Sequence, residues 1–511
     1  MEVLLIGGAP LTRETFVEVA RRKRPVALDA EARSRMERSR RVVEEVARSS
    51  RPVYGITSGF GALADRWIPP ADRRRLQLNL VRSHASAVGS PLPRDLVRAM
   101  MLVRAQGLAQ GNSGVRPTIV ETLLGWLNHD LVPFVPETGS VGASGDLAPL
   151  AHLAWGLVGE GPLLAADGRG AEPSAPALSR AGLQPLVLEE KEGISLVNGT
   201  SLMTAQLGLL LEDGHQLLRA AEFGAAMSFD ALEGNLGPLD GRIQEARGLP
   251  AQIEEARHLR ALLEGSELAR TGEERGQDPY VLRCLPQVLG AVRQGLQWGE
   301  ELFRHEVNAS SDNPLVFGEE ILGGGNFHGQ PIALTLDMLA LALSYVGSFS
   351  ERRIARLVDA KLSRGLPPFL LPEAGVSSGY MIPPYVAAAL VAEDRLLVDP
   401  ASAASLPTSA NQEDFNSQGA TAGAKARRLL DNLSRIVAVE LLLGAQALEL
   451  RRPRHGGVGS ESARAAVRRR APALVEDRSS SADLERIARE LREGSLVAEM
   501  ESGLGNAPPP G

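Results

Sequence analysis

The sequence predicts a mainly α-helical protein, with a long central helical bundle and a smaller α-rich N-terminal domain that carries the candidate active-site loops. Three observations predict this fold class. Apolar residues recur at helical spacing over long stretches between residues 201 and 450. Strand signals are few. With 511 residues, of which 44% are hydrophobic, the chain is long enough to bury a large core.

The N-terminal part alternates short helical patterns with glycine-rich breaks. A short extended segment precedes the first helix, and glycine-punctuated loops follow at residues 54–61 and 111–114. A proline-containing segment, residues 133–136, leads into a further loop of small residues. We expect helices at residues 29–48, 72–88, 93–108, 117–127 and 147–157.

The chain changes character after residues 162–188, a segment rich in Gly, Pro and Ala for which we expect a surface excursion with a short hairpin. Several later patterns exceed the usual helix length of globular proteins, which favours a bundle of long helices. We therefore place an N-terminal domain at 1–200, the bundle at 201–470, and a C-terminal helical segment with a frayed tail at 471–511. The long helices are expected at residues 201–232, 279–303, 331–358, 385–396 and 420–450.

The charge balance argues against a nucleic-acid-binding protein. The formal net charge is −7, whereas such proteins usually carry a basic surplus. Short basic runs such as residues 468–470 are typical of solvated helix faces rather than of a phosphate-binding track. We expect no nucleic-acid partner.

Cysteine content and hydropathy favour a cytoplasmic location. The single cysteine, Cys284, cannot form a disulfide within the chain, which fits a reducing compartment. The first eleven residues lack the basic and apolar regions of a signal peptide. The longest apolar stretches, at residues 207–211 and 338–350, run into acidic residues and are expected to be too short to span a bilayer. We expect no membrane partner.

Lysine scarcity disfavours a pyridoxal phosphate enzyme, which needs a Schiff-base lysine. The four lysines lie outside any glycine-rich context that would hold a phosphate, and Lys23 and Lys191 are expected to be exposed in charged runs. The histidines show no short-spaced pairs of the kind that bind metal ions, so we expect no metal site.

The most informative segment is a loop whose centre is Ala143-Ser144-Gly145. Small residues let a backbone turn tightly on itself. In such a turn the amide nitrogen of Gly145 can attack the carbonyl carbon of Ala143. Loss of water, including the Ser144 hydroxyl, then leaves a five-membered ring with an exocyclic methylene. This ring is 4-methylideneimidazol-5-one, an electrophile made from the chain itself.

Further segments carry polar or aromatic groups suited to chemistry. Tyr54 lies on a glycine-rich loop that can cover a site and exclude water. Asn198, in a Leu-Val-Asn-Gly-Thr segment, can both donate and accept hydrogen bonds. If a helix begins near Pro279, Tyr280 and Arg283 share one of its faces, and the arginine fork suits a carboxylate.

Together these segments resemble the aromatic amino acid ammonia-lyase family over residues from about 50 to about 455. The resemblance implies the ring made from Ala143-Ser144-Gly145 as the prosthetic group, with no external cofactor. It implies Tyr54 as the base at the substrate's β-carbon and Asn198 beside the ring.

The resemblance also implies the residues that bind the substrate. Arg283 would bind its α-carboxylate, with Gln277 on the same wall and Tyr280 beside them as a further catalytic residue. Phe327 would pack by the ring, and Met381 would border the side-chain pocket. A homotetramer with active sites shared between subunits is implied as well, with an amino acid as the substrate.

Three residues indicate the substrate within this family. Ser83-His84 and Glu413 resemble the members specific for histidine, and a carboxylate at 413 can bind an imidazole N–H. The resemblance therefore implies deamination of L-histidine to trans-urocanate and ammonia. The residues Phe415-Asn416 depart from the histidine pattern, which keeps a phenylalanine or tyrosine ammonia-lyase, or an aminomutase, as the alternative.

Rivals from other classes fit less well. A serine hydrolase elbow needs glycine two residues on either side of the nucleophile, and Asp146 occupies one of those positions beside Ser144. A helical scaffold without activity is disfavoured by the intact Ala-Ser-Gly triad together with Tyr54 and Arg283.

Overall fold

The computed structural model describes residues 1–165, 167–168, 170–272, 277–373 and 375–505. It is mainly helical, with 59% helix and 7% strand, which confirms the predicted fold class. The chain packs into two compact units. Unit 1 comprises residues 1–209, 299–337 and 400–424, and unit 2 comprises residues 210–298, 338–399 and 425–511. The predicted domain boundaries at 200 and 470 stay a prediction. The predicted frayed tail lies largely outside the described residues, from 506 onward.

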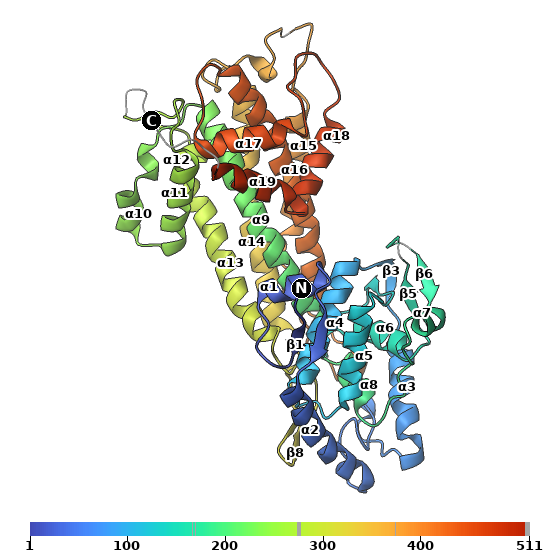
Figure 1. The fold of residues 1–511 in the computed structure, drawn as a ribbon. Coiled ribbons are helices and arrows are strands. Elements are labelled where there is room, and N and C mark those ends of the chain that lie inside the picture. The colour runs from blue at the N-terminus through green and yellow to red at the C-terminus, as the bar shows by residue number, and fades with distance from the viewer. Residues whose placement is uncertain (166, 169, 273–276, 374, 506–511) are drawn as a thin grey trace. The chain divides into compact units, whose positions relative to one another are not determined.

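Unit 1 combines short helices with small two-stranded sheets (Figure 1). The pair β1–β2 is parallel, and the pairs β3–β4, β5–β6 and β7–β8 are antiparallel. Its elements are β1 (Leu4–Ile6), α1 (Arg13–Ala20), β2 (Val26–Leu28), α2 (Ala30–Arg48), η1 (Gly61–Leu63), η2 (Pro70–Asp72), α3 (Arg73–His84), β3 (Val88–Pro91), α4 (Arg94–Ala109), α5 (Pro117–Asn128), β4 (Pro136–Thr138), α6 (Leu147–Leu157), β5 (Pro162–Leu164), β6 (Ala171–Pro173), α7 (Ser174–Arg180), α8 (Glu192–Val197), β7 (Leu315–Phe317), β8 (Glu320–Leu322), η5 (Ala401–Ala403) and η6 (Ser409–Asn411).

Unit 2 is a helical bundle (Figure 1). The chain passes between the two units within four long helices and once more between residues 399 and 400. The four helices are α9 (Ser201–Ala231), α13 (Leu285–Glu306), α14 (Gln330–Val358) and α16 (Gly419–Leu450). The helices and turns that belong to unit 2 alone are η3 (Gly237–Leu239), α10 (Gly241–Arg247), α11 (Pro250–Leu262), α12 (Tyr280–Arg283), η4 (Pro368–Leu370), α15 (Pro383–Leu397), α17 (Val458–Arg468), α18 (Ser481–Arg492) and α19 (Ser495–Leu504).

The predicted helices are found with small shifts of their ends, because apolar periodicity fixes which face is buried more firmly than where a helix stops. The expected hairpin in residues 162–188 is present as β5–β6. The helix predicted at 279–303 is wrong in one respect. It is split into the single turn α12 and the long helix α13, with Cys284 as the C-cap of α12.

The core of unit 2 contains a buried ion pair between helices. Arg353 on α14 donates two hydrogen bonds to the carboxylate of Glu440 on α16, at 2.5 and 2.8 Å, and both side chains are fully buried. Ser228 on α9 donates a further bond of 2.7 Å to Glu440. Each charge is therefore matched by a partner, which a buried charge requires.

Three helices of unit 1 contact one another and carry candidate site residues at their ends. Helices α3, α6 and α8 pack together. His84 is the last residue of α3, the Ala143-Ser144-Gly145 loop precedes α6, and Asn198 follows α8. The packing of these helices therefore brings residues that are far apart in the sequence to one place.

Unit 1 also contains a buried ion pair, which fixes the start of α8. Lys191 is fully buried, and its ammonium group lies 3.2 Å from Asp312 Oδ2 and 2.9 Å from Ser195 Oγ. Burial lowers the pKa of Lys191, while the carboxylate of Asp312 opposes this shift. Ser113 donates to the other oxygen of Asp312 at 2.8 Å. The expectation that Lys191 is exposed is wrong, because its charged neighbours in sequence do not show that it faces Asp312.

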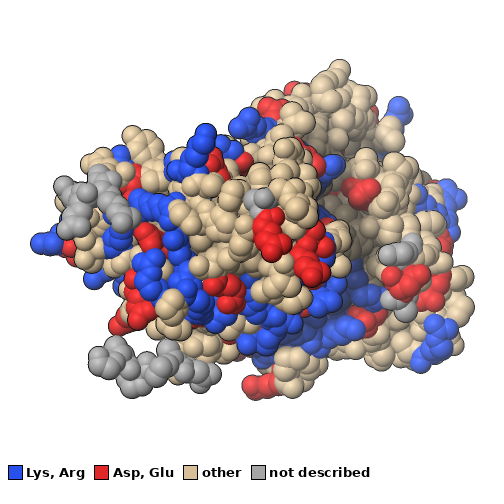
Figure 2. Space-filling model, turned by 90° about the horizontal axis from the view of Figure 1, so that it is seen from above, with Lys and Arg blue, Asp and Glu red and all other residues tan. Residues whose placement is uncertain are grey.

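Charged side chains of opposite sign lie next to one another on the face shown in Figure 2. The basic run at residues 468–470 follows this pattern. Arg468 pairs with Glu449 at 3.4 Å, Arg470 pairs with Glu490 at 2.7 Å, and Arg469 pairs with Glu499. These arginines are therefore engaged by carboxylates of the same unit.

One helix among the described residues, α14, is long and apolar enough to cross a membrane. Its most apolar 18 residues have a mean hydropathy of 1.7, and 56% of them are buried. Such burial is typical of a core helix in a water-soluble protein. The expectation that the apolar stretch at residues 338–350 is too short to span a bilayer is wrong as to length, because the helix extends on both sides of this stretch.

Breaking the Lys191–Asp312 pair should destabilise the protein strongly. Asp312→Ala leaves an unpaired buried ammonium group and should lower the free energy of unfolding by about 3–5 kcal/mol. Urea unfolding measures this change. Glu160→Ala is the control, because it breaks the exposed Arg82–Glu160 pair and should change stability little. Equal losses for the two variants would contradict the role given to Lys191.

Candidate active site

The loop between β4 and α6 contacts the segment that follows α8 through a pair of glycines, one from each segment. Gly145 has a left-handed backbone, with φ 74°, and pairs with Gly199 in a parallel bridge. A Cβ at Gly145 would collide with the carbonyl oxygen of Gly199. Only glycine therefore lets this turn lie against the segment that follows α8.

Asp146 ties the same loop to the first turn of α9. Its Oδ2 accepts hydrogen bonds from the backbone N–H groups of Leu202, at 2.8 Å, and Met203, at 3.1 Å. Its Oδ1 accepts from Ser140 Oγ at 3.0 Å. A carboxylate suits the unpaired N–H groups and positive end of a helix. Complete burial nevertheless raises the pKa of Asp146 to about 6, against these hydrogen bonds.

Asn198 lies beside the triad and donates from Nδ2 to the carbonyl oxygen of Ser144 at 3.0 Å. Its own carbonyl oxygen accepts from Arg104 Nη1 at 2.5 Å. Arg104 is fully buried, and burial lowers its pKa, while the nearby Asp312 and Asp146 carboxylates oppose this. The side-chain Oδ1 of Asn198 has no hydrogen-bond partner among the described residues. The side-chain amide and the backbone carbonyl of Asn198 are therefore hydrogen-bonded, whereas its Oδ1 remains available as an acceptor.

The triad opens onto a cavity of ≈ 1210 Å³ formed by residues of unit 1. This volume accommodates an amino acid with an aromatic side chain. Of the residues that the sequence predicts for the site, the cavity is lined by Tyr54, His84, Ala143, Ser144, Asn198, Phe327 and Glu413. Gly145, the last residue of the triad, adjoins them.

Glu413 faces Ser144 across this cavity. Ser144 Oγ donates to Glu413 Oε1 at 2.5 Å, and Thr408 Oγ1 donates to Glu413 Oε2 at 2.9 Å. The backbones of Thr408 and Glu413 also pair, with N···O distances of 2.8 and 3.3 Å. Both carboxylate oxygens are therefore engaged by hydroxyl groups.

The turn between Thr408 and Glu413 is strained. Three consecutive residues other than glycine have left-handed backbones, with φ 51° at Ser409, 53° at Ala410 and 66° at Asn411. This conformation costs roughly 1–2 kcal/mol per residue, and less for asparagine. A strained segment persists only where surrounding contacts hold it.

Tyr54 and His84 lie on the same cavity. The hydroxyl oxygen of Tyr54 accepts the N–H of Gly61 at 3.1 Å. The His84 ring lies 3.0 Å from Ser83 Oγ through Nδ1. Burial lowers the pKa of His84, which the Leu80 carbonyl and the Glu413 carboxylate oppose, so the ring is mainly neutral at pH 7.

Phe327 belongs to a wall of aromatic residues. Its neighbour in sequence, His328, stacks on Phe415 with ring centroids 5.9 Å apart. The N–H of Gln330 points at His328 Nδ1, at 3.3 Å, so the ring hydrogen is assigned to Nε2, which donates to the Phe415 carbonyl at 3.2 Å. These contacts fix Phe415, the residue that departs from the histidine pattern.

The other predicted site residues belong to unit 2. Arg283 stacks over the Tyr280 ring, with its guanidinium carbon 4.8 Å from the ring centroid, and it donates to the side chain of Gln277. Tyr280 is 66% exposed. Met381 is half-buried just before α15. The sequence prediction that Tyr280 and Arg283 share a helical face is confirmed by this contact.

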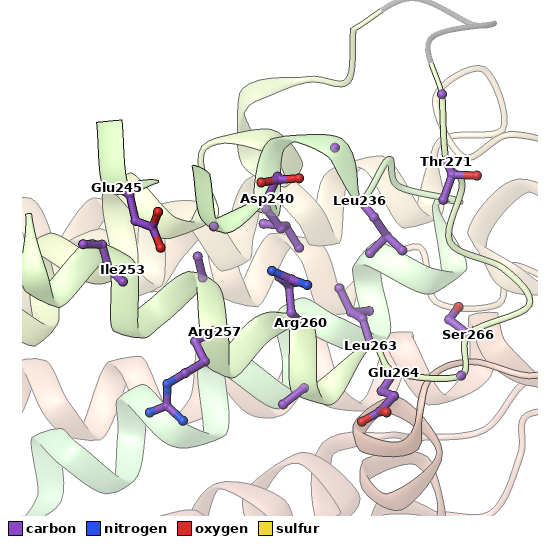
Figure 3. Close-up of a pocket in the computed structure, with 17 residues that line it drawn as sticks. Leu236, Asp240, Glu245, Ile253, Arg257, Arg260, Leu263, Glu264, Ser266 and Thr271 are labelled. Atoms are coloured by element: carbon purple, nitrogen blue, oxygen red, sulfur yellow. The ribbon is translucent and has the colours of Figure 1, made fainter. Parts of the chain in front are cut away.

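Unit 2 also has a cavity of ≈ 900 Å³ between α10, α11 and the segment after α11 (Figure 3). The Arg260 guanidinium points toward Asp240 in this view. Both carboxylate oxygens of Asp240 are hydrogen-bonded by Arg242, and Ser266 Oγ donates to Asp230. Asp240 and Ser266 of this cavity are thus engaged in structural contacts.

Sequence reasoning assigned no role to Asp146, Arg104 or Thr408. Asp146 stands immediately before a predicted helix, which is the position of a capping residue and could have drawn attention. Arg104 is a charged residue inside an otherwise apolar helical pattern, which signals a buried polar contact. Thr408 gives no signal, because only the hairpin brings it to Glu413.

Comparison with known proteins agrees with this fold. The pattern of the aromatic amino acid lyase family matches residues 11–469. The chain is 49% identical over 507 residues to histidine ammonia-lyase of Anaeromyxobacter dehalogenans (strain 2CP-C), covering 97% of this chain and 100% of that protein.

Solved structures of the same kind are also similar. Tyrosine aminomutase from Streptomyces globisporus has a TM-score of 0.94 and 37% identity, covering 98% of this chain and 99% of that one. Histidine ammonia-lyase from Trypanosoma cruzi has a TM-score of 0.91 and 36% identity, covering 98% and 96%. The family match and the full-length similarity to histidine ammonia-lyases define the class of the protein as a carbon–nitrogen lyase. The chain belongs to the aromatic amino acid lyase family.

Replacing Asp146 by asparagine should remove a pH-dependent contribution to stability. The folded state raises the pKa of Asp146 to about 6, so its contribution is full below about pH 4 and is lost as the pH rises through about 6. The difference in unfolding free energy between wild type and Asp146→Asn should therefore fall by about 2 kcal/mol from pH 4 to pH 7.

Urea unfolding across this pH range measures that difference. Asp65→Asn, at an exposed loop residue, controls for the loss of one carboxylate. A difference between wild type and Asp146→Asn that stays constant with pH would show that Asp146 is ionised throughout.

Proposed function

We propose that this chain is a histidine ammonia-lyase, which converts L-histidine to trans-urocanate and ammonia. The observation that carries this proposal is the position of Glu413, which lies over Ser144 in the cavity that His84 also lines. A carboxylate there would bind an imidazole N–H and would be left unpaired by a phenyl ring. The similarity to histidine ammonia-lyases over almost the full length supports the same substrate.

We propose that Ala143, Ser144 and Gly145 close into the methylideneimidazolone ring. Their setting fits it. The left-handed Gly145 is packed against Gly199, and Asn198 donates to the Ser144 carbonyl, whose oxygen would become the ketone oxygen of the ring. The ring would supply an electrophilic carbon that takes up the substrate amine and makes it a better leaving group. No external cofactor is proposed.

The Asn198 side chain would serve both the ring and the substrate. Donation from Nδ2 to the ketone oxygen withdraws electron density from the conjugated carbons and raises their electrophilicity. The unpartnered Oδ1 is an acceptor for the substrate's ammonium hydrogens.

Tyr54 would remove the proton from the substrate's β-carbon as a general base. The Gly61 N–H donates to the phenolic oxygen and orients the tyrosine in the cavity. The elimination then balances, because the β-proton goes to Tyr54, its electron pair forms the new double bond, and the amine leaves from the α-carbon.

The residues of unit 2 would bind the rest of the substrate. We propose that Arg283 binds the α-carboxylate by its bidentate fork, with Tyr280 and Gln277 beside it. Met381 would border the side-chain pocket, and Phe327 would pack against the ring. We further propose a cytoplasmic homotetramer in which subunits share active sites. Turnover by a monomer in solution would exclude shared sites.

The second candidate is a phenylalanine or tyrosine ammonia-lyase or an aminomutase. Phe415 lines the cavity and adds an apolar surface suited to a phenyl ring, and the chain is similar to a tyrosine aminomutase. Glu413 and His84 favour histidine over phenylalanine, because a phenyl ring offers no hydrogen-bonding group to either side chain.

A substrate panel tests the proposed function. Histidine, phenylalanine and tyrosine are offered separately, and the conjugated product is followed by its ultraviolet absorbance. Urocanate from histidine alone is expected. Ser144→Ala should lower kcat at least about 10³-fold, because it removes the precursor of the methylidene carbon. Cinnamate or coumarate as the main product would move the assignment to the second candidate.

Substituting Glu413→Gln should impair histidine turnover more than it impairs any phenylalanine turnover. A charge-assisted hydrogen bond to the imidazole is lost, which should lower kcat/KM for histidine by about 10- to 100-fold. Steady-state kinetics with both substrates provide the test. Glu172→Gln, the same change at an exposed glutamate that does not line the cavity, is the control. Equal losses for both substrates would argue against contact between Glu413 and the imidazole.

A further inference from the structure

We propose that Thr408 is a positioning residue that acts through Glu413. In this inference Thr408, Glu413 and the left-handed turn between them form a clasp that fixes the carboxylate in its imidazole-binding orientation. The inference rests on the proposed function, because it assigns Glu413 to the substrate's ring. It adds a residue and a backbone conformation that determine how that carboxylate is presented.

The two oxygens of Glu413 have different partners. Oε2 accepts from Thr408 Oγ1 at 2.9 Å, within the same hairpin. Oε1 accepts from Ser144 Oγ at 2.5 Å, across the cavity. When the triad closes into the ring, the Ser144 oxygen departs as water and Oε1 loses its donor. The hydrogen bond from Thr408 does not depend on the triad and remains.

Retention of the Thr408 bond has a consequence for binding. A glutamate side chain held at one oxygen loses much of its rotamer freedom before the substrate arrives. The other oxygen, Oε1, then points into the cavity and no longer accepts the Ser144 hydroxyl. A preorganised acceptor binds its ligand at a smaller entropic cost.

The turn makes the clasp possible. Backbone pairing of Thr408 with Glu413 brings the two side chains to one end of a tight loop. The loop closes only because Ser409, Ala410 and Asn411 all take left-handed conformations. Asparagine tolerates the left-handed conformation, but Ser409 and Ala410 do not favour it. Their strained backbones indicate that contacts of the folded protein hold the turn closed.

A second set of bonds closes the base of the loop. The side chain of Asn416 donates to the Leu406 carbonyl oxygen and accepts the Leu406 N–H at 3.3 Å, and the Asn416 N–H donates to Ser405 Oγ at 2.9 Å. Asn416 is fully buried. The departure from the histidine pattern at residue 416 is thus accounted for by backbone contacts below the clasp.

The turn also adjoins the loop that carries Tyr54. The short helices η1 and η6 are in contact, and Ser409 Oγ lies close to Gly61, whose N–H donates to Tyr54. The clasp therefore contacts both Glu413 and the loop that carries Tyr54, the proposed base.

Thr408→Val tests the hydroxyl while keeping the side-chain shape. KM for histidine should rise about tenfold with kcat changed less than about twofold, because the orientation of a ground-state contact is lost. Thr408→Ser should restore KM, since it restores the hydroxyl. Thr421→Val makes the same change at an exposed threonine of α16 and should leave both constants unchanged.

A direct binding measurement separates orientation from turnover. Calorimetric titration with trans-urocanate should show about tenfold weaker binding to Thr408→Val than to wild type, and wild-type binding to Thr408→Ser. Unchanged urocanate affinity and KM in Thr408→Val would overturn the proposal. Equal losses in Thr408→Ser and Thr408→Val would overturn the role of the hydroxyl.

Substitutions at Ala410 test the turn itself. Ala410→Gly should keep KM near the wild-type value, because glycine takes the left-handed conformation readily. Ala410→Val should raise KM, because a β-branched residue opposes that conformation. Equal kinetics for the two variants would contradict the requirement for the left-handed turn.

These outcomes are separable from failure of the proposed function. Absence of histidine turnover in the wild type, with turnover of phenylalanine or tyrosine, would overturn both assignments. Histidine turnover in the wild type with an unaffected Thr408→Val would overturn the clasp alone.

Discussion

The capping of α9 by the Asp146 carboxylate is the contact on which the rest of the site depends. It joins the Ala143-Ser144-Gly145 loop to a helix that begins more than fifty residues later in the sequence. The bridge between Gly145 and Gly199 places the same two segments back to back. Asn198 then meets the Ser144 carbonyl without any flexible element between them. The geometry of the triad is therefore a property of the packed unit rather than of the loop.

Hydrogen bonding compensates for the cost of burying charge around this loop. Arg104, Asp146, Lys191 and Asp312 are all removed from water. Each has a partner of opposite charge, a hydroxyl or a backbone group, which buried charges need. The dense polar network keeps α8 and the triad in register. Such networks define one arrangement of the chain because a half-satisfied alternative is costly.

The cavity is built so that one carboxylate can serve two states of the chain. In the structure, Glu413 accepts the Ser144 hydroxyl. Under the proposed ring formation that oxygen would leave, and the same carboxylate oxygen would become free for a donor on the substrate. His84 supplies a mainly neutral imidazole to the same cavity, since burial lowers its pKa. The proposed arrangement would place specificity for a polar ring next to the proposed reacting group.

The sequence predicts the helical class well because apolar periodicity reports directly on burial. It predicts the long helices α9, α14 and α16 nearly to their ends. It does not predict the break between α12 and α13, because both segments carry helical patterns and tertiary packing determines the kink. It places Lys191 wrongly on the surface, because its partner Asp312 is distant in sequence. Thr408 could not be predicted for the same reason, because its contact with Glu413 depends on the folded turn. Recognisable motifs pointed to Tyr54, His84 and Glu413, and the roles of these three residues stay predictions.

The most direct test of the account is the mass of the peptide that contains residues 143–145. Proteolysis of the active wild-type enzyme followed by mass spectrometry should give this peptide lighter than its sequence by two water molecules. The same peptide from the Ser144→Ala variant should lack the deficit that requires the serine hydroxyl. An unmodified peptide from an enzyme that turns over substrate would contradict the account, because the elimination would then proceed without the internal electrophile.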